Sequence, residues 1–272
     1  MKEFVKTFLK NIYYKLVKLK NLLKRLIFKI PIQNTYVFIL SPPFTGSTML
    51  ADILSTSRHV SINNYLGTKE GQTLPEVKKL MFDSPDRWDQ RIDFNWPYIK
   101  SVWLKYWDIK KPILIEKSPA NILRAKSISS FFKPSQFIIS YRNPYAQCES
   151  IIRRNNDTPE YAANFAIFCL KYQKKNIEHF GNECLIIPYE SLTERVIDFK
   201  KSIVQFLPEI KDISVNHKIN AHNKSGKPLN VQNLNNNKIK NLSKSDLEII
   251  TNIFKKHEKL MKYFNYEIIE TE

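Results

Sequence analysis

The stretch VFILSPPFTGSTMLADIL, residues 37–54, joins an apolar run to a short polar loop and then to a segment with helical spacing. This order predicts a strand, a tight loop and a helix. Gly46 allows the loop backbone to approach a ligand closely. The amides of residues 45–49 are expected to point into the loop, and the following helix adds partial positive charge at its N-terminus. We therefore predict a phosphate-binding loop, with a tight turn that binds no ligand as the alternative.

Hydroxyl groups add donors to this loop, because Thr45, Ser47 and Thr48 belong to it. A phosphate held in this way needs no cation from the loop itself. The Walker A pattern G-x-x-x-x-G-K-[ST] is absent, and no carboxylate stands in an obvious position for a metal ion. ATP hydrolysis is therefore not the expected reaction.

Four short apolar runs predict strands that are buried on both faces of a sheet. They span residues 36–40, 113–115, 137–141 and 185–187. Helical patterns lie between them, and this alternation predicts an α/β fold with a parallel sheet. The runs are followed by the polar loops SPPFTGST, EKSPAN, RNPY and PYESL. Ligands of such sheets bind at the carboxyl ends of the strands, so we expect the four loops to converge on one site.

A second anion site is indicated by FIISYRNPYAQCESIIRR, residues 137–154. Arg142 follows the third apolar run, Ser150 comes eight residues later, and Arg154 four residues after that. If a helix begins near Pro144, Ser150 and Arg154 share one of its faces. Arg142 would then bind an anion together with them through charge-assisted hydrogen bonds. The alternative is an arginine that pairs with a surface carboxylate.

Together, the two motifs resemble those of the PAPS-dependent sulfotransferases, where PAPS is 3′-phosphoadenosine 5′-phosphosulfate. The resemblance rests on Pro-x-[Ser/Thr]-Gly-[Ser/Thr]-Thr after the first strand and on an Arg with Ser at +8 after a later strand. It extends through EKSPAN, YESL, the KSGKP loop and the C-terminal helix, over roughly residues 35–265. The broad glycan- and tyrosylprotein-type branch is more similar than the small-phenol branch. The resemblance implies a three-layer P-loop NTPase-like fold, with a central parallel β-sheet flanked by helices.

The resemblance also implies roles for individual residues. The 5′-phosphosulfate would be bound by Thr45, Gly46, Ser47, Thr48 and Met49. The 3′-phosphate would be bound by Arg142 and Ser150, with Arg154 as a helper. Tyr189 would lie near the adenine. A flap that covers the nucleotide would carry Ser225, Gly226 and Lys227.

The sequence departs from the family at Phe44, where a lysine or arginine usually steadies the departing phosphate. Lys117 of EKSPAN is the candidate substitute, because it matches a lysine that some members place at the sulfuryl group. An ion pair with Glu116 or another carboxylate is the alternative role for it. Glu70 matches the glutamate that the glycan and tyrosine types use as a base soon after the first helix. A solvated loop glutamate is the alternative for Glu70, and Glu76 is the reserve candidate for the base.

Composition sets wider bounds on the protein. The 272 residues, of which 43% are hydrophobic, fit one large domain with appendages. The net charge of +17 attracts polyanions in general, although a genome that favours Lys, Asn and Ile is an alternative cause. Charge alone does not identify a partner, and we do not expect the protein to bind nucleic acid. We expect reduced cysteines and no metal, because neither the three cysteines nor the five histidines show metal-ligand spacing.

The first 30 residues hold nine Lys or Arg and a single Glu. Spacings of four and three alternate among their apolar residues, which predicts one apolar stripe along a helix. The stripe consists of Val5, Leu9, Ile12, Leu16, Leu19, Leu23, Leu26 and Ile30. Three interpretations are open: packing on the chain's own domain, docking on an anionic membrane surface, and a coiled-coil seam.

Lysines interrupt the apolar region that a secretory signal needs, and no run of 18 apolar residues indicates a transmembrane span. We therefore expect a cytoplasmic protein that is either free or peripheral on a membrane surface.

The predicted organisation is a basic amphipathic helix over residues 1–33 and a sulfotransferase domain over residues 34–272. Within that domain, residues 55–110 are predicted to form an acceptor-side insertion, and the Asn- and Lys-rich residues 216–241 a nucleotide-covering flap. All four tryptophans fall in the insertion. We expect them, above all Trp103 and Trp107, to be core residues rather than to stack on an acceptor sugar.

The predicted reaction is transfer of the sulfuryl group from PAPS to a hydroxyl of a carbohydrate, a lipid or a peptide tyrosine, with release of 3′,5′-ADP. No metal is needed, because the group in transit carries less charge than a phosphoryl group. The alternatives are a catalytically impaired relative that binds a nucleotide or a glycan, and a P-loop kinase.

Overall fold

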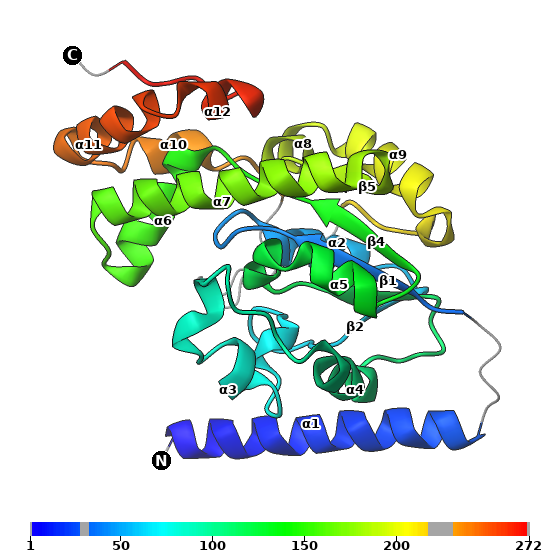
Figure 1. The fold of residues 1–272 in the computed structure, drawn as a ribbon. Coiled ribbons are helices and arrows are strands. Elements are labelled where there is room, and N and C mark those ends of the chain that lie inside the picture. Colours follow the sequence, from blue (N-terminus) through cyan, green and yellow to red (C-terminus); the bar gives the residue numbers. More distant parts are fainter. Residues whose placement is uncertain (1, 28–32, 217–230, 271–272) are drawn as a thin grey trace.

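The structure is a computed structural model that describes residues 2–27, 33–216 and 231–270. Its centre is a sheet of five parallel strands in the order β2-β3-β1-β4-β5. The strands are β1 (Thr35–Leu40), β2 (Val60–Ile62), β3 (Ile113–Glu116), β4 (Ser135–Ile139) and β5 (Cys184–Ile186). Helices cover both faces of the sheet and give three layers (Figure 1). The α/β fold with a central parallel sheet is therefore confirmed.

The helices of the described residues connect and cover these strands. The α-helices are α1 (Lys2–Ile27), α2 (Ser47–Leu54), α3 (Lys78–Met81), α4 (Trp96–Tyr106), α5 (Ala125–Phe131), α6 (Pro144–Asn155), α7 (Pro159–Phe180), α8 (Tyr189–Glu194), α9 (Val196–Phe206), α10 (Asn235–Ile239), α11 (Lys244–Lys255) and α12 (Glu258–Tyr263). Short 3-10 helices are η1 (Gly71–Thr73), η2 (Pro85–Trp88), η3 (Pro119–Leu123), η4 (Gly181–Glu183) and η5 (Pro208–Ile210).

Alternating side chains of β1 build a core on each face of the sheet. On one face, Tyr36, Phe38 and Leu40 pack with side chains of α4, α5 and α7. On the other face, Val37 and Ile39 pack with α2 and α9. All five side chains are buried, which explains why the strand reads as a continuous apolar run.

The tryptophans of the insertion belong mainly to the first of these cores. Trp96, Trp103 and Trp107 are fully buried, and Trp88 is partly buried. The Trp107 indole also donates a hydrogen bond to the Ile115 carbonyl of β3, at 3.0 Å. The expectation that Trp103 and Trp107 are core residues is confirmed.

The sequence prediction missed β2, which lies inside the stretch assigned to the insertion. β2 pairs with β3 through Val60 opposite Ile113 and Ile62 opposite Ile115. A strand of three residues is too short for its pattern to stand out from a loop. The segment between the first and second predicted strands therefore contains the edge strand β2, and the rest of the segment lies outside the sheet.

The loop after β4 leads directly into α6. The Asn143 side chain caps this helix by accepting hydrogen bonds from the amides of Tyr145 and Ala146, at 3.0 and 3.4 Å. Pro144 occupies the first turn, where its missing N–H costs nothing. The predicted helix start near Pro144 is confirmed, and it fixes Arg142 at the end of the sheet.

The N-terminal helix α1 lies along α4 at one side of the molecule (Figure 1). It contacts the domain through Tyr14 and Asn21, which are buried, whereas the predicted apolar stripe from Val5 to Leu26 is exposed. Ile30, the last residue of that stripe, lies outside the described residues. No described helix combines the length and the apolar character that crossing a bilayer requires.

Candidate active site

The loop between β1 and α2 turns through two residues with left-handed backbone, Phe44 at φ 65° and Gly46 at φ 86°. Glycine is required at position 46 for a second reason, since a Cβ there would lie 2.7 Å from Cδ2 of Tyr189. The first hydrogen bond of α2 runs from the Leu50 amide to the Gly46 carbonyl, at 3.1 Å. The amides that precede Leu50 in the helix therefore have no intrahelical acceptor, as an anion-binding helix start requires.

The predicted phosphosulfate ligands occupy different positions around this loop. The Thr45 hydroxyl donates to the Pro42 carbonyl at 2.6 Å, so it stabilises the loop itself and leaves its backbone for a ligand. Ser47 is buried at the helix start, and Met49 packs against the core on the α2 side of the sheet. Thr48 is partly exposed and faces the end of β3.

Lys117 reaches this loop from the end of β3. Its Nζ lies 3.1 Å from Oγ1 of Thr48 and 3.3 Å from Oε1 of Glu70. The Lys117 side chain is only 2% exposed. Burial lowers the pKa of the Lys117 ammonium, and the neighbouring Glu70 carboxylate opposes this shift. The chain thus places a buried cation beside the loop in which Phe44 replaces the family's lysine or arginine.

The Glu70 carboxylate lies between Lys117 and Gln72. Its Oε2 accepts a hydrogen bond of 2.6 Å from Nε2 of Gln72. Its backbone carbonyl accepts hydrogen bonds from Nδ2 of Asn64 and Oγ1 of Thr73, both at 2.8 Å. Glu70 is 8% exposed, so the alternative of a solvated loop glutamate is wrong.

Glu76, the reserve candidate for the base, has a different environment. Its Oε1 accepts from Nζ of Lys18 at 2.8 Å, and its Oε2 accepts from the hydroxyl of Tyr106 at 2.6 Å. These contacts join α1 to the insertion. They give Glu76 a structural role at the helix α1 contact.

Glu116, named above only as an alternative partner of Lys117, is buried and supports the backbone next to Glu70. Its carboxylate accepts hydrogen bonds from the Gly71 amide, at 3.0 Å, and from the side chains of Ser118 and Asn121. Burial raises the pKa of Glu116 to about 7. A Cβ at Gly71 would lie 2.7 Å from Oε1 of Glu116, so glycine allows this close approach. The polar residues that follow β3 in EKSPAN were the available signal for this network, and they fix the backbone next to Glu70.

Arg142 lies on the other side of the loop between β1 and α2. Its Nε donates to Oδ1 of Asn235 at 2.6 Å, and its Nη1 donates to the Phe44 carbonyl at 3.2 Å. The guanidinium carbon lies 4.0 Å from the centre of the Tyr189 ring. Nη2 is buried and finds no hydrogen-bond partner among the described residues.

A buried guanidinium with an unpaired N–H is costly. Burial also lowers the pKa of Arg142, and no carboxylate of the described residues lies within ion-pair distance of it. The arrangement therefore fits an anionic ligand at Nη2 and does not fit the alternative of a surface ion pair.

Ser150 belongs to a polar cluster next to this arginine. Its hydroxyl lies 2.7 Å from Nζ of Lys238, which also contacts Oε2 of Glu149 at 2.7 Å. Arg153 holds the other oxygen of Glu149, at 2.6 Å. Lys238 and the Arg142 partner Asn235 come from α10, and sequence analysis missed both. Their stretch is rich in Asn and Lys throughout, so no single residue stood out in it.

Phe44 and Arg154 contact each other, because the Arg154 guanidinium carbon lies 5.5 Å from the centre of the Phe44 ring. The Phe44 ring packs against the cluster built by α6, α7 and α11. The aromatic ring thus turns toward α6, while the Phe44 carbonyl accepts from Arg142. Phe44 therefore links the loop between β1 and α2 to the Arg142 environment through its carbonyl, and it supplies no cation to that loop.

Tyr189 is held in place by backbone groups of the segment that leads to α10. Its hydroxyl donates to the Gln232 carbonyl at 3.0 Å and accepts from the Leu234 amide at 3.3 Å. The predicted flap residues Ser225, Gly226 and Lys227 lie outside the described residues.

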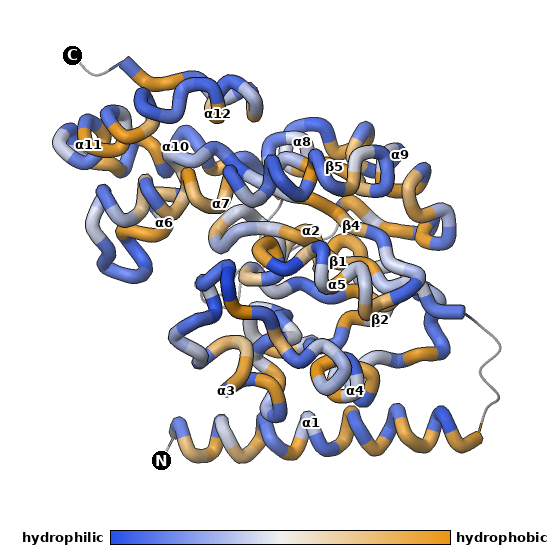
Figure 2. Tube along the Cα trace, in the orientation of Figure 1, coloured by the Kyte–Doolittle hydropathy of each residue, from blue (hydrophilic) through white to orange (hydrophobic). Residues whose placement is uncertain are grey.

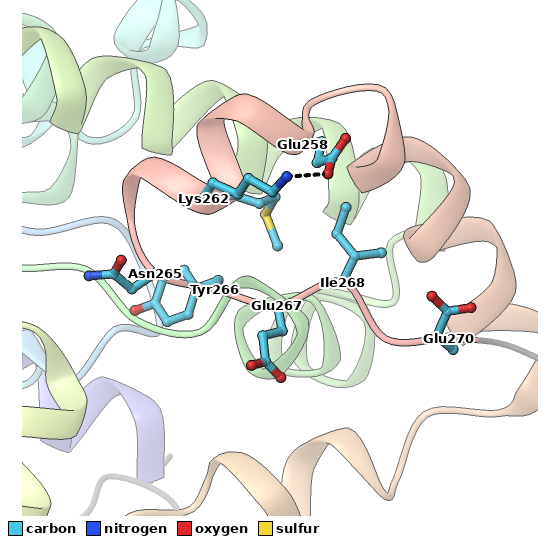
Figure 3. A pocket seen from close by; sticks show the side chains of 8 residues that line it. Glu258, Lys262, Asn265, Tyr266, Glu267, Ile268 and Glu270 are labelled. Atoms are coloured by element: carbon cyan, nitrogen blue, oxygen red, sulfur yellow. Dashed lines mark ion pairs between the residues drawn. The ribbon is translucent and has the colours of Figure 1, made fainter.

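A pocket beside the C-terminal segment has a chemistry that does not suit a nucleotide (Figure 3). It is lined by Glu258, Met261, Lys262, Asn265, Tyr266, Glu267, Ile268 and Glu270. Three glutamates would repel a polyanion, and the Lys262 ammonium is already paired with Glu258 at 2.7 Å. The Lys117 and Arg142 environments are therefore the candidate site.

Comparison with known proteins bears on this geometry. The sequence model of a family described as "Sulfotransferase family" matches residues 37–210. The chain belongs to the sulfotransferase family. The matched region of this sulfotransferase contains the loop between β1 and α2, Glu70, Lys117 and the Arg142 motif. No match was found among curated protein sequences.

Solved structures support the fold of this family member. A sulfotransferase domain from the curacin biosynthetic pathway has a TM-score of 0.51 and 17% identity, over 88% of this chain and 100% of that one. A sulfotransferase from Alicyclobacillus acidocaldarius has a TM-score of 0.51 and 12% identity, over 87% of this chain and 98% of that one. At such identities the likeness establishes the P-loop-like fold alone.

Proposed function

We propose that this sulfotransferase moves the sulfuryl group from PAPS to a hydroxyl of a carbohydrate, lipid or tyrosine acceptor and releases 3′,5′-ADP. The observation that carries the proposal is the position of Lys117, whose Nζ lies within hydrogen-bonding reach of Thr48 on the loop and of Glu70. A cation and a carboxylate thus meet at one end of a phosphate loop.

In the proposed reaction, Glu70 accepts the proton of the acceptor hydroxyl as its oxygen forms the new bond to sulfur. The bond between sulfur and the bridging phosphate oxygen breaks at the same time. Lys117 stabilises the negative charge that develops on that oxygen, and the free amides at the start of α2 hold the phosphate. Aligning donor and acceptor supplies a further contribution on the order of 7–11 kcal/mol.

The Arg142 environment fits the 3′-phosphate of the nucleotide. The unpartnered Nη2 of Arg142 would donate to a phosphate oxygen, with Ser150 and Lys238 beside it. Tyr189 lies under the guanidinium and against Gly46, so it separates the two anion sites at a position suited to the nucleoside. A kinase that uses ATP would have no need of a second anion site of this kind.

The proposal is tested by transfer of labelled sulfate from PAPS to a panel of glycans, lipids and peptides, together with calorimetric binding of 3′,5′-ADP and 5′-ADP. We expect a labelled product and much tighter binding of 3′,5′-ADP. Tight binding without transfer to any acceptor would favour the catalytically impaired alternative. Equal binding of the two nucleotides would contradict the assignment of the 3′-phosphate site.

Arg142→Ala is expected to weaken 3′,5′-ADP binding by about 10–100-fold, because hydrogen bonds to charged groups are worth about 1.5–3 kcal/mol. Binding of 5′-ADP should change little, since it has no 3′-phosphate. Arg195, an exposed arginine whose Nη2 donates to the Ser191 hydroxyl at 3.0 Å, offers a control. If Arg195→Ala and Arg142→Ala weakened the binding of both nucleotides equally, a general effect of charge would explain the result, and the specific contact of Arg142 with the 3′-phosphate would be contradicted.

A further inference from the structure

Helix α1 is fixed to the domain by polar contacts along one face. Nδ2 of Asn21 donates to the carbonyls of Lys105 and Tyr106, at 3.2 and 2.8 Å, so it caps the C-terminal end of α4. The Tyr14 hydroxyl donates to Oδ1 of Asn64 at 3.3 Å, and Lys18 pairs with Glu76 at 2.8 Å. These contacts set the rotation of α1 about its axis.

The opposite face of α1 is apolar and uncovered. Phe4, Phe8, Leu9, Leu16, Leu19 and Leu26 each expose more than half of their surface, between 52% and 77%. Figure 2 shows this hydrophobic face running along the side of α1 that is turned away from the rest of the molecule. Because Asn21 and Tyr14 hold the helix in its orientation, the apolar face cannot turn inward without breaking their hydrogen bonds.

The charges of α1 favour an anionic partner for this face. Glu3 is its one acidic residue, and Lys15 and Lys20 are exposed at opposite edges of the apolar face. A coiled-coil pair of two copies would bring such lysines together with no acidic residues to match them. The apolar face is also wider than the two positions per heptad of a coiled-coil seam, because it includes Phe8 as well as Leu9.

We propose that α1 docks this protein on the surface of an anionic lipid bilayer. The apolar face enters the boundary between headgroups and acyl chains, and Lys15 and Lys20 contact the anionic headgroups. The docked helix contacts the segment that carries the candidate base, since Tyr14 bonds Asn64 and Asn64 bonds the Glu70 carbonyl. Docking thus brings the segment between β2 and β3, which carries Glu70, close to the bilayer, whatever the acceptor is.

The test is co-sedimentation of the full chain with vesicles of phosphatidylcholine alone and of phosphatidylcholine with about one-quarter phosphatidylserine. We expect binding to the anionic vesicles, weaker binding to the zwitterionic ones, and release at about 0.5 M salt. The double variant Leu16→Asp/Leu19→Asp should lower partitioning at least about tenfold, because it places two charges in the apolar face. Lys15→Glu/Lys20→Glu should lower it about tenfold or more on anionic vesicles only.

Ile197→Asp is the matched control, since Ile197 on α9 is 71% exposed but belongs to another surface. It should leave partitioning unchanged, and thermal unfolding should show that all variants are folded, as expected for exposed positions. Absence of wild-type binding, or equal binding to both kinds of vesicle, would overturn the proposal. A coiled-coil role would replace it if sedimentation velocity showed that the wild type is a dimer and Leu16→Asp/Leu19→Asp a monomer, while neither protein bound vesicles.

Discussion

Lys117→Ala is expected to lower kcat by about 10²–10³-fold, the usual cost of removing one preorganised donor from developing charge. The dissociation constant of 3′,5′-ADP should change little, because the Arg142 environment and the amides of α2 are left intact. Lys117 takes this role in our proposal because Phe44 cannot: its ring lies against Arg154, and only its carbonyl faces Arg142. Single-turnover transfer of labelled sulfate, with calorimetry of the product nucleotide, measures both effects.

Lys100→Ala provides the control for Lys117→Ala. Lys100 is a partly buried lysine, and its Nζ donates to the Phe131 carbonyl at 2.8 Å, away from the loop. It should retain near-normal turnover. Full turnover by Lys117→Ala would exclude the idea that this lysine replaces the missing cation.

The pH dependence of the wild-type enzyme gives an independent check. Burial lowers the pKa of Lys117, so its ammonium loses the proton at a lower pH than an ordinary lysine does. Since the proposed role needs the charged form, kcat should fall as the pH rises through this lowered pKa. The alkaline fall in rate should therefore begin below the ordinary lysine range.

The sheet and the meeting of its loops could be predicted because each depends on local pattern and on a general rule. Buried strands read as apolar runs, and parallel strands place the residues that follow them at one edge. Thr48 and Lys117 are 69 residues apart in sequence, yet each follows a strand, and the structure brings them within 3.1 Å. The position of Glu70 beside them came from resemblance rather than from any periodic signal.

Other features could not be predicted because they depend on partners distant in sequence. The period of α1 revealed its apolar face, but the face that contacts the domain is set by the carbonyls at the end of α4, which Asn21 satisfies. Lys238 is one lysine in a stretch rich in them, and only its contact with Ser150 distinguishes it. Likewise, the sequence identifies Glu116 only as the end of a strand. Its hydrogen bond with the Gly71 amide is visible only in the structure.

Glu70→Gln is expected to lower kcat by about 10²–10⁴-fold, the range of a lost general base. The substitution keeps the size of the side chain, and the backbone contacts of residue 70 with Asn64 and Thr73 do not involve the carboxylate. Binding of 3′,5′-ADP should therefore persist. Glu76→Gln is the matched control: its carboxylate pairs with Lys18, so the change should weaken the contact of α1 while kcat stays within about twofold.

The coupling between Glu70 and Lys117 allows two roles of Glu70 to be distinguished: a general base, and a residue that only keeps Lys117 charged. The Glu70 carboxylate raises the pKa of Lys117 against the lowering by burial, so Glu70→Gln should move the alkaline fall of the residual rate to lower pH. If Glu70 acted only by keeping Lys117 charged, Glu70→Gln would recover normal turnover at acidic pH, where Lys117 is protonated in either protein. A base predicts that the rate stays low there too, because no carboxylate is present to accept the acceptor's proton.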